Sequence, residues 1–269
     1  MTADSATQGV PHPDDRGTAT CRIEARAGGE VAWITVAHEG KMNAMGTGMM
    51  NVLIRIFADL EARADLRVAI LTGAGTRAFV GGAFVPEMHA LDVQSSRVFI
   101  DRLHHVLLAV RQCPVPVIAR VSGYCLGAGT DLAAACDFRV ADKSAVFGMP
   151  EVRVGMPAVI EAALLPMLIG WGRTREMLMT GANYSAAQGR EMGFFETVCE
   201  ADAIDAVIEE KIRHIFAGGP LAVRAQKRLI NAWEERFPAD AIRLGLDYME
   251  RAIETGEPQR MMAPLLKRS

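Results

Sequence analysis

The segment from Pro114 to Ala141, PVPVIARVSGYCLGAGTDLAAACDFRVA, restricts the fold more than any other part of the chain. It reads as a strand with prolines at its start, a glycine-rich turn, a short helix over 128–135 and a second strand. Strands that alternate with helices pair in parallel, so this order predicts an α/β fold.

The same alternation runs through the preceding residues. A strand is expected over 31–36, a helix with apolar residues at helical spacing over 49–60, and another strand in RVAILTGAG. A loop then enters a helix that has Pro86 in its first turn, where proline is favoured. A further helix is expected over 98–110.

From about residue 203 onward the pattern changes to helices alone. We therefore expect three parts: a flexible polar tail over 1–20, an α/β core over 21–202 and a helical C-terminal appendage over 203–269. The tail lacks the apolar stretch of a signal peptide, and it is too acidic for a transit peptide.

Composition excludes several classes of protein. The net charge is −3 and the positive residues are scattered, so no nucleic-acid partner is expected. No apolar run reaches the ~18 residues of a membrane span, so no membrane partner is expected either. The five cysteines form no CxxC pair and no metal-ligand spacing. An odd number without a signal peptide indicates reduced thiols, which predicts a cytoplasmic protein without a metal site.

The turn at Gly127, Ala128 and Gly129 precedes a helix, whose first amides have no intrahelical partner. Small residues let a ligand approach those amides, and the helix dipole favours negative charge there. The turn lacks the lysine and hydroxyl of a phosphate loop and the third glycine of a dinucleotide loop. A second such turn runs from Gly81 to Ala83. Either both are ordinary strand-to-helix turns, or each supplies one N–H to the same carbonyl oxygen.

Two carboxylates accompany these turns. Asp131 lies one helical turn past the glycines, and Glu151 follows twenty residues later in FGMPEVRVG. Their apolar or small neighbours predict carboxyl pKa values raised by desolvation. Two such carboxyls near a polarised carbonyl can move protons at carbons close to a thioester. The structural alternatives are that Asp131 stabilises its own helix N-terminus and that Glu151 caps a helix or pairs with Arg153.

The sequence resembles the crotonase, or enoyl-CoA hydratase/isomerase, superfamily over roughly 23–267. The motifs that carry the resemblance are KMNAM, RAFVGGAFVPEM, the segment 114–141 with AVFGMPEVRVGMP, and LIGWGRTREMLMTGANYSAAQGREMGFFETV. The resemblance implies an α/β, crotonase-like spiral of ββα units with a helical C-terminal region. In the family that region helps to build homotrimers and often dimers of trimers.

The resemblance also implies the chemistry. Two backbone N–H groups, which fall on Ala83 and Ala128, would hold the thioester oxygen of an acyl-CoA and stabilise an enolate. Asp131 and Glu151 occupy the positions of the two hydratase glutamates. Coenzyme A would enter as part of the substrate, so no separate cofactor is expected.

Several positions depart from the family pattern. Asp131 is one methylene shorter than the usual glutamate, and the same aspartate–glutamate pairing is seen in dienoyl-CoA isomerases. Those enzymes have a further aspartate, whose nearest match here is Ala158. Glu161 is close by and is interpreted as an acid at a helix N-terminus, with a third site carboxylate as the alternative. Phe84 replaces the usual aspartate; it cannot cap a helix, but could line the acyl or pantetheine channel.

The resemblance places the adenine of coenzyme A along the turn from Gly81 to Ala83 and the KMNAM turn, with basic residues near the phosphates. The expected substrate- and CoA-binding residues are Lys41, Met42, Arg77, Gly82, Phe84, Gly127 and Lys267. The alternative for each of these cations is an ordinary solvated side chain.

Three functions stay open from the sequence. A 2-enoyl-CoA hydratase would hold a water between Asp131 and Glu151, and an enoyl-CoA or dienoyl-CoA isomerase would use the carboxyls to move a proton along the acyl chain. A non-catalytic scaffold or RNA-binding relative is disfavoured by the acidic balance. Since some family hydrolases and dehalogenases use histidines, His104 and His105 are kept as a weaker alternative.

Overall fold

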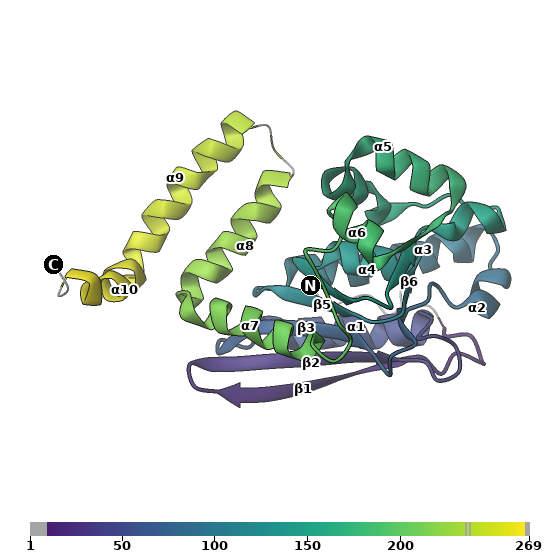
Figure 1. Cartoon of the computed structure of the whole chain (residues 1–269), viewed down its shortest axis with the longest axis horizontal. Coiled ribbons are helices and arrows are strands. Elements are labelled where there is room, and N and C mark those ends of the chain that lie inside the picture. The colour runs from purple at the N-terminus through teal and green to yellow at the C-terminus, as the bar shows by residue number, and fades with distance from the viewer. Residues whose placement is uncertain (1–9, 235, 237, 267–269) are drawn as a thin grey trace.

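The computed structural model describes residues 10–234, 236 and 238–266 (Figure 1). Its main sheet has six strands in the order β1-β2-β3-β5-β7-β10. The β1–β2 pair is an antiparallel hairpin, and every later pairing in this sheet is parallel. The strands are β1 (Thr18–Arg26), β2 (Gly29–Ala37), β3 (Leu66–Gly73), β5 (Val117–Val121), β7 (Phe138–Asp142) and β10 (Thr197–Cys199).

A second, smaller sheet lies beside the first and has the order β4-β6-β8-β9. Its strands are only three residues long: β4 (Ala78–Val80), β6 (Tyr124–Leu126), β8 (Val146–Gly148) and β9 (Asn183–Ser185). Three times the chain passes from the main sheet to this one, from β3 to β4, from β5 to β6 and from β7 to β8, and then enters helical structure. This repeat confirms the expected spiral of ββα units.

The helices follow the predicted alternation. The segment that restricts the fold most has its helix at the predicted bounds, Ala128–Ala135. The helices of the core are α1 (Thr47–Glu61), α2 (Val85–His89), α3 (Val93–Gln112), α4 (Ala128–Ala135), η2 (Pro150–Val154), η3 (Ile160–Leu164), α5 (Leu165–Thr180) and α6 (Ala186–Met192). The C-terminal helices are α7 (Ile204–Ala217), α8 (Pro220–Glu234), α9 (Pro238–Glu254) and α10 (Glu257–Leu266).

The central strands β3, β5 and β7 are buried on both faces, because their side chains alternate between the two faces and helices cover each of them. One face packs with α1, α3 and α4 in the larger apolar cluster. The other face is covered by α7 (Figure 1). Its residues Ile204, Ile208 and Ile212 recur at helical spacing and are buried against the sheet. α7 therefore packs on the sheet, whereas α8 to α10 follow it, and the expected boundary at residue 203 stays a prediction.

The expected tail over 1–20 is also too long. β1 already begins at Thr18, and the sequence analysis missed this strand. Asp15 is buried and accepts a hydrogen bond of 2.8 Å from the backbone N–H of Gly48 in the first turn of α1. Residues from 10 onward are thus part of the folded structure, while residues 1–9 lie outside the described part of the chain.

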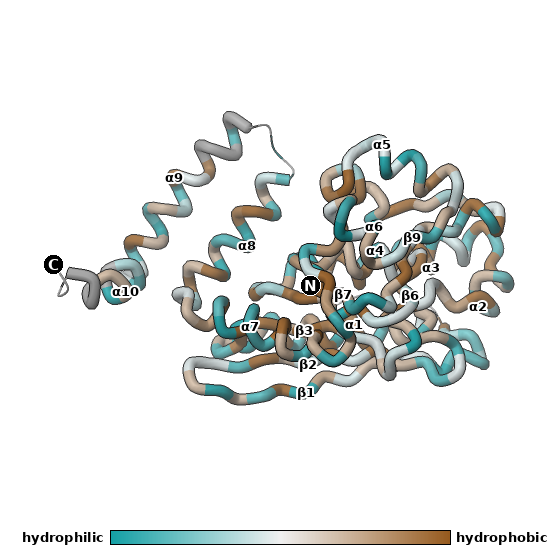
Figure 2. Tube along the Cα trace, in the orientation of Figure 1, coloured by the Kyte–Doolittle hydropathy of each residue, from teal (hydrophilic) through white to brown (hydrophobic). Residues whose placement is uncertain are grey.

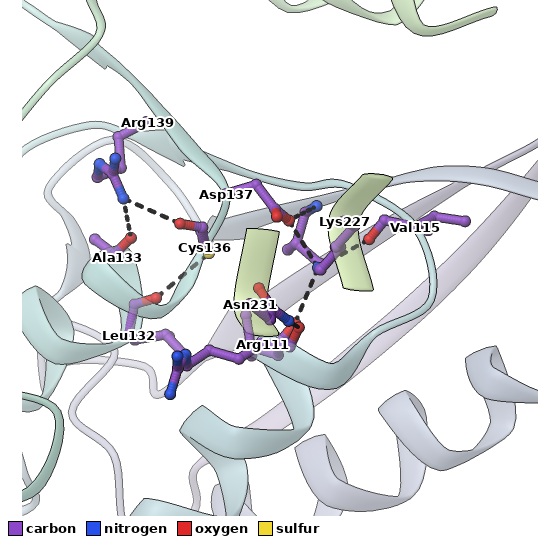
Figure 3. A network of polar contacts seen from close by, with 11 residues as sticks. Arg111, Val115, Leu132, Ala133, Cys136, Asp137, Arg139, Lys227 and Asn231 are labelled. Carbon is purple, nitrogen blue, oxygen red and sulfur yellow. Dashed lines mark hydrogen bonds and ion pairs between the residues drawn. The ribbon is translucent and has the colours of Figure 1, made fainter. Parts of the chain in front are cut away.

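Helices α8, α9 and α10 extend to one side of the core (Figure 1). Lys227 of α8 connects these helices to the core. Its Nζ lies 2.7 Å from Oδ2 of Asp137 and 3.0 Å from the carbonyl oxygen of Val115 (Figure 3). Figure 2 shows hydrophobic residues along α8 and α9. Several of their apolar side chains are exposed, namely Ile230, Trp233, Leu246, Met249 and Ile253. Assembly into the expected trimer would cover these exposed apolar side chains, and the trimer stays a prediction. None of the described helices is long and apolar enough to span a membrane.

Candidate active site

The glycine-rich turn lies where β6 ends and α4 begins. Gly127 has a left-handed backbone (φ 52°), and Ala128 is the first residue of α4. A methyl group on Gly129 would collide with the carbonyl oxygen of Val80, at the end of β4. Glycine at position 129 therefore lets the start of α4 pack directly against the strand that leads into the other turn.

That other turn, over 81–83, is held by the KMNAM segment. The N–H of Gly81 donates to the carbonyl oxygen of Met42, and the N–H of Met45 donates to that of Gly82, each at 2.8 Å. A methyl group on Gly127 would lie 3.9 Å from Cα of Gly82, so the two turns are neighbours in space. The structure thus brings together the two turns that the sequence analysis singled out.

The backbone N–H groups of Ala83 and Ala128 are the candidate oxyanion donors. Within the described residues, neither N–H donates a hydrogen bond to the protein. Ala128 is buried, and Ala83 is half-buried. Buried N–H groups are normally paired, so an unpaired one on each of two adjoining turns suits an acceptor from a ligand. That both donate to a single oxygen stays a prediction.

Asp131 lies in the first turn of α4 and is 5% exposed. Its Oδ1 is buried and has no hydrogen-bond partner among the residues that the structure describes. Desolvation, together with the nearby charges of Glu151 and Glu161, raises the pKa of the Asp131 carboxyl well above its usual range. This environment therefore favours the neutral form of the Asp131 carboxyl over the charged form.

Glu151 comes from η2 and is half-buried. A methyl group on Gly127 would lie 2.5 Å from its Oε1, so glycine there makes room for this carboxyl. Its Oε2 is buried without a partner, and desolvation raises its pKa. No described contact pairs Glu151 with Arg153, so the salt-bridge alternative is not supported. Two predicted carboxyls therefore flank one glycine turn.

Glu161 is a third buried carboxyl, which the sequence analysis left as an alternative. It stands in the first turn of η3, as an acid at a helix N-terminus would, but its side chain is only 4% exposed. Its Oε1 lies 2.8 Å from Nδ1 of His104, and its Oε2 is buried without a described partner. His104 is on α3, and no local sequence pattern could have linked residues so far apart.

The carboxyls of Asp131, Glu151 and Glu161 do not form a metal site. Across the described residues, no group of three or more histidine, cysteine, aspartate or glutamate side chains is arranged to hold a metal ion. The site therefore offers neutral or ionising carboxyl groups for proton transfer and unpaired amides for an oxyanion.

The expectation that Phe84 lines the acyl or pantetheine channel stays a prediction. The residue is the N-cap of α2 without a side-chain cap, as predicted. Its ring is buried and packs against the rings of His12 and His38, with ring centroids 5.9 and 4.8 Å apart.

A hollow of about 300 Å³ lies beside the KMNAM turn and is lined in part by Met42 and Arg77. Met42 and Asn43 both have left-handed backbones, and Asn43 stabilises this turn by donating to the carbonyl oxygens of Ala74 and Ala78. Lys41 is exposed next to Met42. The structure thus groups three of the expected CoA-binding residues, whereas Lys267 lies outside the described residues.

Comparison with known proteins gives matches to enoyl-CoA hydratases and to the enoyl-CoA hydratase/isomerase family. A family model described as enoyl-CoA hydratase/isomerase matches residues 26–262. The Bacillus subtilis protein YngF, named for enoyl-CoA hydratase/isomerase, is 33% identical over 226 residues, which cover 84% of this chain and 87% of its own. A short-chain-enoyl-CoA hydratase of Clostridium acetobutylicum is 30% identical over 204 residues, covering 76% and 78%. The crystal structure of an enoyl-CoA hydratase from Bacillus anthracis matches with a TM-score of 0.87 at 29% identity, covering 92% of this chain and 96% of that one.

Proposed function

Because the chain belongs to the enoyl-CoA hydratase/isomerase family, we propose that it is a 2-enoyl-CoA hydratase, which reversibly adds water across the 2,3 double bond of an acyl-CoA. One observation carries the proposal: Asp131 and Glu151 each bury an unpartnered carboxyl oxygen beside two turns with unpaired amides. Buried polar groups without partners are costly, so a ligand that satisfies them is expected. The names of the hydratase relatives support the same reading.

The amides of Ala83 and Ala128 bind the thioester oxygen of the substrate. When a nucleophile adds at C3, negative charge moves through C2 to this oxygen and an enolate forms. Fixed N–H donors in a site that excludes water stabilise such charge more than bulk water does, by about 3–4 kcal/mol for a single donor. The start of α4 adds the partial positive charge of a helix N-terminus.

Asp131 and Glu151 have different roles in this mechanism because they differ in burial. Asp131, more deeply buried and next to two other carboxyls, stays neutral and holds the reacting water by a hydrogen bond. Glu151 is the more exposed of the two and is the group that ionises. Its carboxylate takes a proton from the water as the water oxygen bonds to C3, and then returns that proton to C2 of the enolate. Overall, OH is added at C3 and H at C2.

The CoA part of the substrate binds across the KMNAM turn. Lys41 and Arg77 face its phosphates, and Met42 and Gly82 contact the adenosine and pantetheine portions. Both cations stand at or beside the hollow next to this turn, where their charges can attract phosphate groups. The cofactor thus arrives and leaves as part of the substrate.

An enoyl-CoA or dienoyl-CoA isomerase is the second candidate. Two observations favour it: the acid on α4 is the shorter Asp131, and Glu161 supplies a third buried carboxyl near it. A carboxyl displaced by about one bond length loses alignment with a water at C3, whereas proton transfer along the acyl chain needs no water at that carbon.

One experiment separates the candidates. The protein is incubated with crotonyl-CoA, and separately with a 3-enoyl-CoA, in H₂¹⁸O, and the products are resolved by mass. Uptake of ¹⁸O into 3-hydroxybutyryl-CoA is the result that hydration requires. Migration of the double bond without oxygen uptake would identify the isomerase, and an absence of both reactions would contradict the proposed chemistry.

A further inference from the structure

Thr130 is a fully buried residue of the candidate site that the proposed mechanism does not use. It lies in the first turn of α4, two residues after Ala128 and directly before Asp131. Its hydroxyl oxygen is 2.7 Å from the carbonyl oxygen of Cys125 and 2.9 Å from that of Gly148. Since a hydroxyl has one hydrogen, these two carbonyl oxygens share it as acceptors. A buried hydroxyl is unfavourable without such partners, so the two contacts hold the side chain at the start of α4.

Neither of the two acceptors belongs to α4. The hydroxyl of a threonine inside a helix often bonds to a carbonyl oxygen of the preceding turn of the same helix. The hydroxyl of Thr130 bonds instead to Cys125, in β6 before the turn, and to Gly148, the last residue of β8. It therefore joins the start of α4 to two strands of the smaller sheet.

The carbonyl oxygen of Gly148 also holds the other side of the turn. It accepts a hydrogen bond of 2.9 Å from the N–H of Gly127, whose backbone is left-handed (φ 52°). Gly127 and Thr130 lie on either side of Ala128 in the sequence, and both bond to this one oxygen atom. A rotation of the peptide between Gly127 and Ala128 would turn the Ala128 N–H and disturb these contacts. The direction of this candidate oxyanion donor therefore depends on Gly148.

The strand that ends at Gly148 also leads to the proposed base. Gly148 is followed by Met149 and then by η2, which carries Glu151. A methyl group on Gly127 would lie 2.5 Å from Oε1 of Glu151, so the carboxyl lies close against the turn. A movement of β8 relative to α4 would therefore displace the Glu151 carboxyl relative to the Ala128 N–H.

From these contacts, and resting on the proposed function, we propose that Thr130 is a positioning residue of the site. Its hydroxyl bonds to the protein rather than to the substrate. It keeps the Ala128 N–H directed at the thioester oxygen and in fixed relation to the carboxyl of Glu151. A displacement of about 1 Å in a site can lower a rate by about 10²-fold. Loss of the hydroxyl should therefore slow formation of the enolate more than it weakens binding of the acyl-CoA.

The first test compares kcat and KM for crotonyl-CoA hydration among folded variants. Thr130→Val nearly keeps the shape of the side chain but has no hydroxyl, and it should lower kcat by about 10- to 10²-fold while KM stays nearly unchanged. Thr130→Ser keeps the hydroxyl and should retain most of the parent kcat. Thr174→Val is the matched control, because Thr174 is also buried and its hydroxyl lies 2.9 Å from the carbonyl oxygen of Gly170, within α5. This control should leave kcat unchanged.

Two results of this comparison would overturn the proposal. The first is a Thr130→Val protein with the kcat of the parent. The second is a kcat for Thr130→Ser as low as that of Thr130→Val, because the methyl group and not the hydroxyl would then be the group that matters. If Thr130→Val does not fold, Thr130→Cys takes its place in the same comparison, since a thiol is only a weak donor.

A ligand that undergoes no turnover separates the role of Thr130 from the hydration. Acetoacetyl-CoA loses a proton at C2 to give an enolate, which has its own ultraviolet absorption band. Donors directed at the thioester oxygen favour this enolate over the keto form. At one fixed pH, the ratio of bound enolate to bound keto form should be about tenfold lower in Thr130→Val than in the parent. Thr130→Ser and Thr174→Val should match the parent.

The two proposals can then fail independently. If the parent shows the enolate band but takes up no ¹⁸O with crotonyl-CoA, the hydratase proposal fails, and the band still decides the role of Thr130. An enolate ratio in Thr130→Val equal to that of the parent would overturn the positioning role. A parent without any enolate band would overturn it as well, because there would be no oxyanion site for Thr130 to position.

Discussion

Replacement of Asp131 by asparagine should make the folded protein more stable at neutral pH, by an amount that grows with pH. In the unfolded chain an aspartate has a pKa of about 3.9 and is ionised above that value. In the folded protein, desolvation and the neighbouring carboxyls raise the Asp131 pKa. The native state therefore binds one more proton than the unfolded state between these two pKa values. Linkage then requires the free energy of unfolding to fall as pH rises through this window.

The magnitude follows from the slope of this linkage. One proton taken up on folding lowers the free energy of unfolding by about 1.4 kcal/mol for each pH unit, until pH passes the folded-state pKa. The asparagine side chain takes up no proton on folding. The difference in unfolding free energy between the variant and the parent should therefore grow by about 1.4 kcal/mol for each pH unit. A partial offset of about 1–3 kcal/mol, independent of pH, arises because the new amide also needs hydrogen-bond partners.

The assay is urea unfolding at pH 5, 6 and 7 at one fixed protein concentration, since assembly would shift apparent stability. The difference in unfolding free energy between Asp131→Asn and the parent is plotted against pH. Asp202→Asn serves as the control, because Asp202 is an exposed aspartate in the turn before α7, and its difference from the parent should not widen in this way. Parallel curves for parent and Asp131→Asn over the whole range would refute the claim that Asp131 is held neutral.

Three further predictions concern the site, the anchor of the C-terminal helices and the assembly. Ala128→Pro deletes one candidate oxyanion N–H at the first position of α4, where proline fits, and should lower kcat by about 10²–10³-fold; a folded variant with full activity would contradict the assignment. Lys227→Met leaves Asp137 without its cation and should lower the free energy of unfolding by about 3 kcal/mol or more in urea unfolding, and an unchanged midpoint would disprove this anchor. Light scattering at micromolar concentration should give a trimer or a dimer of trimers, because α8 and α9 expose apolar side chains, and a monomer would exclude it.

Local patterns accounted for much of the fold. The helix of residues 128–135 was predicted with its observed bounds because a glycine turn precedes it and a strand pattern follows it. The strand Thr18–Arg26 was missed although its apolar residues alternate with polar ones, because two of those apolar residues are alanines, which favour strands only weakly. Pairing with β2 stabilises it. The burial of α7 was missed for a related reason: an amphipathic helix shows that it covers something, but not which surface it covers.

At the site, the residues on the two glycine turns were predictable, but their partners were not. Asp131 and Glu151 could be proposed from motifs, and the structure brings both to the same turn. The contact between His104 and Glu161 joins α3 to η3, and it depends on how the spiral folds back on itself. The burial of the Phe84 ring could not be predicted, because a side chain beside a turn can face either the ligand or the core, and only packing decides between them.

The central claim is that Glu151 moves the proton while Asp131 holds the water. The most direct measurement is kcat for crotonyl-CoA hydration by Glu151→Gln and by Asp131→Asn, both confirmed as folded. Glutamine keeps the shape and hydrogen bonding of Glu151 but cannot take up the proton, so that variant should lose on the order of 10²- to 10⁴-fold, and Asp131→Asn should lose less. A fully active Glu151→Gln beside an inactive Asp131→Asn would contradict the account by reversing the two roles.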